Sequence, residues 1–248
     1  MTTPFVIVPA LTAVHDNTFR HDLLDPYAAR AAASWVDAYL LSGSTTRGDL
    51  LTIAQRADLI DLWLQHLPPQ RLIACCWHPE DITEATARGV AAMMVMRNLS
   101  DRRAAVEFLA NLPLGTYIYS HPIYTPAVFD AALAADAAAA GVLPAGGKIA
   151  KIGVEGVAKV HAVTGPDFAL WDGSSRHIAA SVRAGAAGVI ATPLSPLPSP
   201  FPSADLHVLQ PAIDTIQAAL DVLPSRAERT AMLTRMAFTT APDDTRRR

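Results

Sequence analysis

Two kinds of segment alternate along the chain. Short apolar runs, rich in β-branched residues, are separated by longer stretches in which Ala, Leu, Arg and Glu recur at helical spacing. The apolar runs predict eight strands: Phe5–Ala10, Ala38–Ser42, Arg71–Cys76, Ala91–Met96, Thr116–Ser120, Lys148–Ile152, Asp167–Trp171 and Gly188–Thr192. Helices are predicted between them, for example at Asp22–Trp35, Thr52–Leu67, Asp101–Ala110, Pro126–Ala140 and Ser174–Ala184.

Continuous apolar strands that alternate with helices indicate a parallel sheet covered on its outside. Eight such units predict an α/β fold, a (β/α)8 TIM barrel, over residues 1–203. A doubly wound open sheet is the competing fold, but it usually has fewer strands, and no Gly-x-Gly-x-x-Gly follows the first strand. A last barrel helix and a short C-terminal helix are expected over 204–240, followed by a disordered tail at 241–248.

Composition narrows the class of protein. No apolar stretch approaches the roughly 20 residues that span a bilayer, and the N-terminus lacks the pattern of a secretory signal. The only cysteines, Cys75 and Cys76, are adjacent and are expected to be reduced, which favours a cytoplasmic location. A net charge of −3 and a pI of about 6.2 give no electrostatic reason to expect nucleic acid as a partner.

The candidate chemistry lies where strands end, because barrel active sites form at the C-terminal face. Lys151 ends an apolar run, and a buried lysine with a lowered pKa is a nucleophile suited to Schiff-base formation. An amine that reaches solvent or a carboxylate is an equally good interpretation of Lys151. Lys148, three positions earlier, faces the opposite side and is expected to be a solvated residue at the strand's start.

Hydroxyl groups end two other strands. Tyr119 could pass protons, although packing in the core is the commoner role for such a tyrosine. The loop that contains Ser44 and Thr45 could bind an anion or simply be a solvated turn. No His-Glu-x-x-His, paired Cys-x-x-Cys, P-loop or Gly-x-Ser-x-Gly is present, so neither a metal site nor a serine hydrolase is predicted.

Four segments at or near strand ends form a pattern when they are taken in order: Gly43-Ser44-Thr45-Thr46-Arg47, Tyr119-Ser120-His121-Pro122-Ile123-Tyr124-Thr125, Lys151 with Val157 and Val160, and Gly185-Ala186-Ala187-Gly188-Val189-Ile190-Ala191. Together they resemble the dihydrodipicolinate synthase / N-acetylneuraminate lyase family of class I, Schiff-base aldolases. The resemblance implies a (β/α)8 barrel that needs no cofactor, binds a 2-oxo acid such as pyruvate and an aldehyde, and assembles as a dimer or tetramer.

The resemblance also assigns roles. Lys151 would form the imine, Tyr119 would relay protons, and Thr45 would hydrogen-bond to Tyr119. Ser44 and Thr45 would bind the substrate carboxylate, and Gly173 and Ile190 would offer backbone groups near the site.

The chain departs from the family at several positions. The arginine that the synthases use for a second carboxylate is Tyr124, and the Pro-Tyr-Tyr after strand four is replaced by Arg97-Asn98-Leu99-Ser100. The sequence therefore predicts a class I aldolase or lyase whose second substrate is unassigned. The alternative is a catalytically impaired barrel that acts as a binding or structural protein. A metal-dependent aldolase is less favoured, because ligand clusters are missing.

Overall fold

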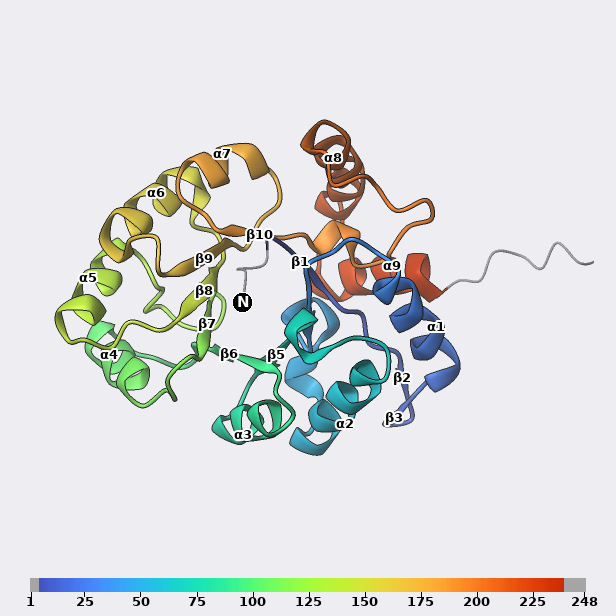
Figure 1. Ribbon diagram of the computed structural model, residues 1–248, viewed down its shortest axis with the longest axis horizontal. Helices are drawn as coiled ribbons and strands as arrows, with labels where there is room; N and C mark the ends of the chain where they lie inside the picture. Colours follow the sequence, from blue (N-terminus) through green and yellow to red (C-terminus); the bar gives the residue numbers. More distant parts are fainter. Residues whose placement is uncertain (1–4, 239–248) are drawn as a thin grey trace, which may run out of the picture.

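The computed structural model describes residues 5–238, and within them eight parallel strands form a closed barrel (Figure 1). Around the barrel the order is β1, β10, β9, β8, β7, β6, β5 and β4, so each strand lies beside its predecessor in the sequence and β1 closes on β10. Their bounds are β1 Val6–Pro9, β4 Ala38–Leu41, β5 Leu72–Cys76, β6 Ala91–Val95, β7 Tyr117–Ser120, β8 Gly146–Ile149, β9 Ala169–Asp172 and β10 Gly188–Ile190. A small antiparallel hairpin, β2 Val14–His15 and β3 Thr18–Phe19, follows β1.

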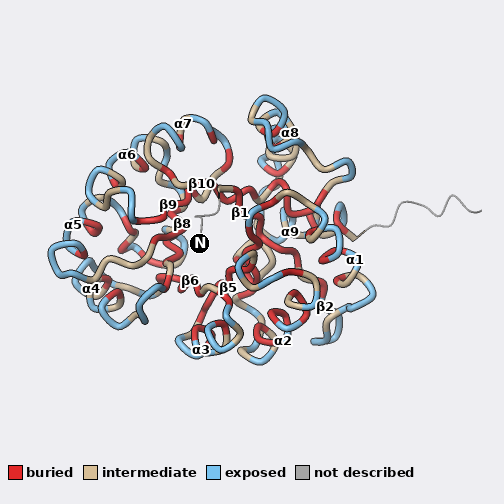
Figure 2. The backbone as a smooth tube through the Cα atoms, viewed as in Figure 1, coloured by how far each residue is buried: buried red, intermediate tan, exposed pale blue. Residues whose placement is uncertain are grey.

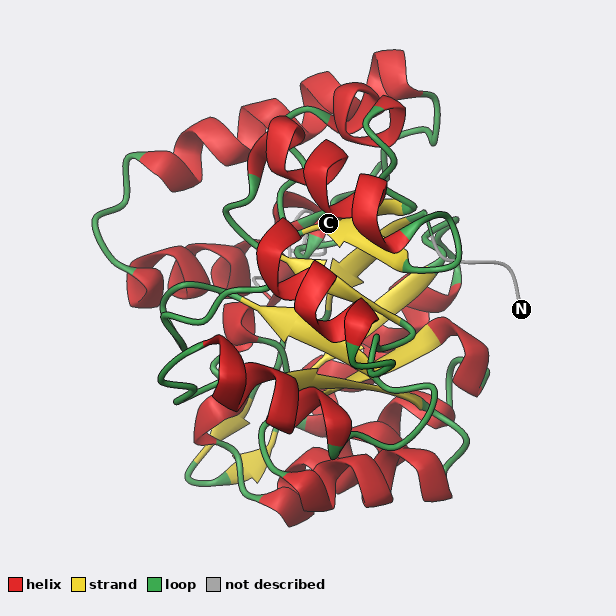
Figure 3. Cartoon of the chain, turned by 90° about the vertical axis from the view of Figure 1, so that its left-hand side faces the viewer, coloured by secondary structure: helices red, strands yellow, loops and turns green. Residues whose placement is uncertain are grey.

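The predicted TIM barrel is confirmed, and each predicted strand overlaps one strand of the barrel. Helices surround the strands on the outside (Figure 3). Their bounds are α1 His21–Ala32, α2 Ile53–Leu64, α3 Pro79–Ala87, α4 Arg102–Ala110, α5 Ala131–Ala139, α6 Gly153–Thr164, α7 Ile178–Arg183, α8 Leu206–Asp221 and α9 Arg226–Phe238. The tail predicted at 241–248 lies outside the described residues.

Local capping explains where several helices begin. The Thr52 side chain accepts a hydrogen bond from the Gln55 N–H while the Gln55 side chain accepts one from the Thr52 N–H, which makes a capping box at α2. Asp130 caps α5 by accepting from the Leu133 N–H at 2.9 Å. The predicted start of this helix at Pro126 was therefore wrong by five residues.

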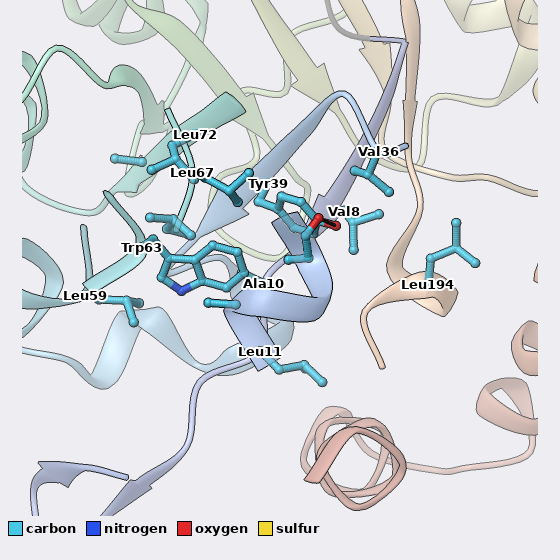
Figure 4. Close-up of a cluster of buried hydrophobic side chains, with 14 of the residues drawn as sticks. Val8, Ala10, Leu11, Val36, Tyr39, Leu59, Trp63, Leu67, Leu72 and Leu194 are labelled. Carbon is cyan, nitrogen blue, oxygen red and sulfur yellow. Dashed lines mark hydrogen bonds between the residues drawn. The ribbon is translucent and has the colours of Figure 1, made fainter. Parts of the chain in front are cut away.

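The core has two layers. Outside the strands, apolar side chains of β1, β4 and β5 pack against the helices, as Tyr39 of β4 does against Trp63 of α2 in Figure 4. Inside, a second cluster fills the barrel: Ile7, Ala38, Leu40, Ile73, Cys75, Trp77, Met93, Val95, Tyr119, Ala169, Trp171 and Ile190. The strands are accordingly the most continuously buried part of the chain in Figure 2.

Strand register decides which side chains point into the barrel. Tyr119 of β7 pairs with Lys148 of β8, which in turn pairs with Trp171 of β9. Paired residues of neighbouring parallel strands lie on the same face of the sheet. Because Tyr119 and Trp171 belong to the interior cluster, Lys148 also points inward.

Helix α9 packs against α1. Arg30 of α1 donates a hydrogen bond to the Ala237 carbonyl at 2.8 Å, and the Tyr27 and Phe238 rings lie 5.2 Å apart. Near its start, Thr230 donates to the carbonyl of Thr45 at 2.6 Å. These contacts fix α9 beside the loop that follows β4.

Candidate active site

A pocket of about 450 Å³ lies at the C-terminal ends of the strands. Its lining contains every residue that the sequence predicts for the site: Ser44, Thr45, Tyr119, Lys151, Gly173 and Ile190. It also contains Lys148, His121, Asp172 and, from α9, Arg226 and Thr230. The structure thus brings the predicted residues together and adds others.

Lys148 is the buried lysine of the pocket. Only 4% of the residue is exposed, and its Nζ lies 4.1 Å from the centroid of the Tyr119 ring, over the ring face. Burial lowers the pKa of Lys148 to about 8, and the nearby Cys75 opposes this shift. A substantial fraction of the amine is therefore neutral and nucleophilic just above neutral pH.

Lys151 lies beyond the end of β8. The strand ends at Ile149, Ala150 donates one more ladder bond to the Ser120 carbonyl, and Lys151 then turns the chain with φ of 63°. Its side chain is exposed at the rim of the pocket. The prediction that Lys151 lies in a buried strand was wrong, and so was the expectation that Lys148 is solvated.

Tyr119 is buried, and its hydroxyl has one hydroxyl partner. Its Oη lies 2.8 Å from Ser44 Oγ. Burial raises the pKa of Tyr119 well above its usual value, against the smaller effect of the Ser44 hydrogen bond, so the phenol stays protonated. The expected partner was Thr45, whereas Ser44 makes the contact and Thr45 lines the pocket beside it. Two linked hydroxyls can pass a proton between them.

The loop that carries Ser44 is held by its backbone. Trp77 Nε1 donates to the Ser42 carbonyl at 2.9 Å, and Arg56 Nη1 donates to the Gly48 carbonyl at 3.2 Å. A Cβ at Gly48 would lie only 1.7 Å from the Ser42 oxygen, so the chain can approach this closely only at a glycine. The site hydroxyl therefore sits on a fixed scaffold rather than on a free loop.

The Arg56 guanidinium is itself buried and paired. Its Nε donates to Asp81 Oδ1 at 2.8 Å, and both side chains are 4% exposed. The other Asp81 oxygen accepts from the N–H groups of Trp77 and His78 at 2.8 and 2.9 Å. One carboxylate thus fixes both the arginine and the start of α3.

Gly173 and Ile190 lie where the resemblance implies, after β9 and at the end of β10. The Gly173 N–H already donates to the Ile149 carbonyl at 2.9 Å, so it is engaged within the barrel. Ile190 is 1% exposed and belongs to the interior cluster. Both residues contribute to the shape of the pocket floor.

His121 and Asp172 also line the pocket. His121 Nδ1 accepts the Ile123 N–H at 3.0 Å, so the neutral ring carries its proton on Nε2. Burial, followed by the charges of Lys148, Lys151 and Arg226, lowers the pKa of His121 to about 4. Burial raises the pKa of Asp172, whose oxygens accept from the Ser181 hydroxyl at 2.6 Å and the Ser174 N–H at 3.0 Å.

Within residues 5–238, no group of three or more His, Cys, Asp or Glu side chains is arranged to hold a metal ion. No helix in the same range has the length and apolarity that crossing a membrane requires.

The fold and site define a parallel (β/α)8 barrel with a buried lysine and a tyrosine–serine pair at its mouth. Comparison with solved structures finds the same fold in dihydrodipicolinate synthase family proteins. One from Coccidioides immitis is 19% identical, with a TM-score of 0.69, over 97% of this chain and 79% of that chain. Dihydrodipicolinate synthase from Aquifex aeolicus is 17% identical, with a TM-score of 0.69, over 98% of this chain and 84% of that chain.

A 2-keto 3-deoxygluconate aldolase from Picrophilus torridus is also similar, at 14% identity and a TM-score of 0.66 over 93% of this chain and 83% of that chain. No protein-family model and no curated protein matches the chain. The resemblance read from the four sequence segments is therefore confirmed at the level of the fold.

Proposed function

We propose that this chain is a class I aldolase or lyase in which Lys148, rather than Lys151, forms a Schiff base with the keto group of a 2-oxo acid such as pyruvate. The observation that carries the proposal is the Lys148 amine, buried in the pocket against Tyr119 with a pKa lowered to about 8. The similarity of the fold to structures described as synthases and an aldolase supports the same reaction class.

The proposed reaction uses the residues in order. The neutral Lys148 amine attacks the keto carbon, and Tyr119 and Ser44 move the protons as the carbinolamine loses water to become the imine. Loss of a proton from the adjacent carbon leaves an enamine, because the imine nitrogen accepts the electron pair. The enamine carbon then attacks the carbonyl carbon of an aldehyde, and water hydrolyses the new imine to release the product and the amine. Cleavage is the same sequence reversed.

Ser44 and Thr45 bind the carboxylate of the oxo acid in this proposal. Both belong to a short 3-10 helix, Ser44–Thr46, and both line the pocket with hydroxyl-bearing side chains that can donate to an anion. The impaired-barrel alternative is not favoured, because the pocket is hollow and its lysine, tyrosine and serine lie together. The cytoplasmic location and the dimer or tetramer remain predictions from the sequence.

Borohydride trapping tests the proposal. The protein is incubated with pyruvate and related 2-oxo acids, reduced, digested and mapped by mass spectrometry. We expect an adduct on Lys148 in the wild type and in Lys151→Ala, and none in Lys148→Ala. The rate of trapping should rise with pH through about 8, because the neutral amine is the nucleophile.

The matched lysine variants separate the outcomes. An adduct on Lys151 that survives Lys148→Ala would overturn the assignment of the lysine while retaining the reaction class. No adduct with any oxo acid of a broad panel would overturn the proposed function itself.

A further inference from the structure

Arg226 brings a guanidinium from the start of α9 into the pocket that holds Lys148. Its Nη1 donates to Tyr124 Oη at 2.7 Å, and its Nη2 lies 3.4 Å from Asp49 Oδ2. The Thr230 contact with the Thr45 carbonyl, one helical turn later, fixes this end of α9. Arg226 is therefore positioned over the site by a helix rather than by a mobile loop.

The charge of Arg226 is only partly compensated. A guanidinium has five N–H donors, and two of the nitrogen atoms have the partners just described. The Asp49 carboxylate is shared, since Arg47 also donates to both of its oxygens at 3.2 and 3.3 Å. One carboxylate cannot neutralise two guanidinium groups, and the Arg226 side chain keeps 34% of its surface exposed.

The pocket as a whole has an excess of cations. Its lining includes five basic side chains, Lys148, Lys151, Arg176, Arg226 and Arg229, but only two carboxylates, Asp172 and Asp221. Asp221 already accepts a bidentate pair of hydrogen bonds from Arg176, at 2.8 and 2.6 Å. Asp172 is turned to Ser181 and the Ser174 N–H.

The pocket carries more positive charge than the binding of one simple oxo acid requires. Pyruvate brings one carboxylate, for which Ser44 and Thr45 provide the proposed site, and its keto group reacts with Lys148. Arg226 is then left with unpaired donors at the mouth. Planar, forked guanidinium donors match the oxygens of carboxylate and phosphate groups.

We propose that the aldehyde partner of this reaction carries an anionic group, a carboxylate or a phosphate, at the end remote from its carbonyl, and that Arg226 binds that group. This inference rests on the proposed function, because it names the second substrate of the same site. Arg226 acts as a specificity-determining residue that selects among aldehydes, while the imine chemistry at Lys148 does not require it.

The test compares aldehydes that differ only in charge, with pyruvate as the common oxo acid. Glyceraldehyde 3-phosphate is paired with glyceraldehyde, and succinic semialdehyde with butanal. We expect the wild type to prefer the anionic member of at least one pair by kcat/KM, and the pair that responds distinguishes phosphate from carboxylate. Arg226→Gln should lower kcat/KM for that anionic aldehyde about 10- to 100-fold, the range expected for losing hydrogen bonds to a charged group, and leave its neutral partner unchanged.

Two further variants provide controls. Arg176→Gln removes a guanidinium from the same lining that is already paired with Asp221, and should leave the preference unchanged. Arg226→Lys keeps the charge but not the forked donors, and its loss of kcat/KM for the anionic aldehyde should be intermediate. This variant also tests the role of Arg226 if Arg226→Gln folds poorly.

The outcomes separate this inference from the proposed function. Equal kcat/KM for charged and neutral aldehydes, or an equal loss on all aldehydes in Arg226→Gln, would overturn the role of Arg226. Trapping of pyruvate on Lys148 without any condensation with the anionic aldehydes would also overturn it while the imine function stands. Failure of the trapping itself would remove both.

Discussion

The buried amine of Lys148 should cost the protein stability, and replacing it with methionine measures that cost. Methionine has a similar unbranched length but no charge. The pKa of Lys148 falls from its ordinary value of 10.5 to about 8, mainly through burial. Since each tenfold change in a protonation equilibrium is about 1.4 kcal/mol, the protonated amine destabilises the fold by about 3 kcal/mol.

The cost should depend on pH in one direction. Because the pKa of Lys148 is lower in the folded state, the unfolded chain holds more protons between pH 8 and 10.5. Wild-type stability from this group therefore rises with pH across that window, and the cost is fully present below pH 8. Lys148→Met, which has no such group, should be more stable than the wild type at pH 7 by about 3 kcal/mol, with the advantage shrinking towards pH 10.5.

Urea unfolding at pH 7, 8, 9 and 10, followed by circular dichroism, provides the free energies of unfolding. Lys151→Met is the matched control, because that side chain is exposed and should give a small, pH-independent difference. A difference between Lys148→Met and wild type that stays constant across the pH series would refute the reasoning. It would mean that the folded protein does not lower the pKa of this lysine.

Two other substitutions test the scaffold behind the site. Asp81→Ala leaves the Arg56 guanidinium buried without its carboxylate and should lower the free energy of unfolding by about 3–5 kcal/mol in urea titrations; a loss below about 1 kcal/mol would contradict this account of the pair. Gly48→Ala forces a methyl group against the Ser42 carbonyl, so the Ser44 loop must shift and KM for pyruvate should rise; unchanged kinetics with unchanged stability would show that the close approach is dispensable.

Most of the barrel could be predicted from the chain alone. Buried parallel strands are apolar along their whole length, whereas apolar residues in the covering helices recur at helical spacing, so the two kinds of segment are easily told apart in the sequence. Element boundaries were less visible. Thr125 and Pro126 carry the signals of a helix start, and the Thr125 hydroxyl accepts from the Ala127 N–H at 3.2 Å while donating to the Leu99 carbonyl, yet the helix begins only at Ala131.

The choice between two lysines could not be made from period two alone. That pattern states that Lys148 and Lys151 face opposite sides of an extended strand, but not where the strand ends. The register of Lys148 with Tyr119 and the left-handed turn at Lys151 show which of the two side chains is buried, and the register depends on a neighbouring strand. The local periodicity was correct, but only the pairing with a neighbouring strand shows where β8 ends and which lysine it carries inward.

Arg226 was missed for a different reason. It contacts Tyr124 across 102 residues, and no local spacing relates the start of α9 to the loop after β7. A charge in the first turn of a surface helix is commonplace in any sequence. Only the closed fold reveals that this one faces the pocket.

The Thr230–Thr45 hydrogen bond joins positions 185 residues apart, so it can form only after α9 has been synthesised. The strands that carry Lys148 and Tyr119 leave the ribosome well before α9 does. A nascent or truncated chain that ends before α9 would hold Lys148 and Tyr119 without Arg226 and Thr230, which line the same pocket. In the proposed function, α9 is therefore the element through which the choice of aldehyde could diverge while the strands stay unchanged.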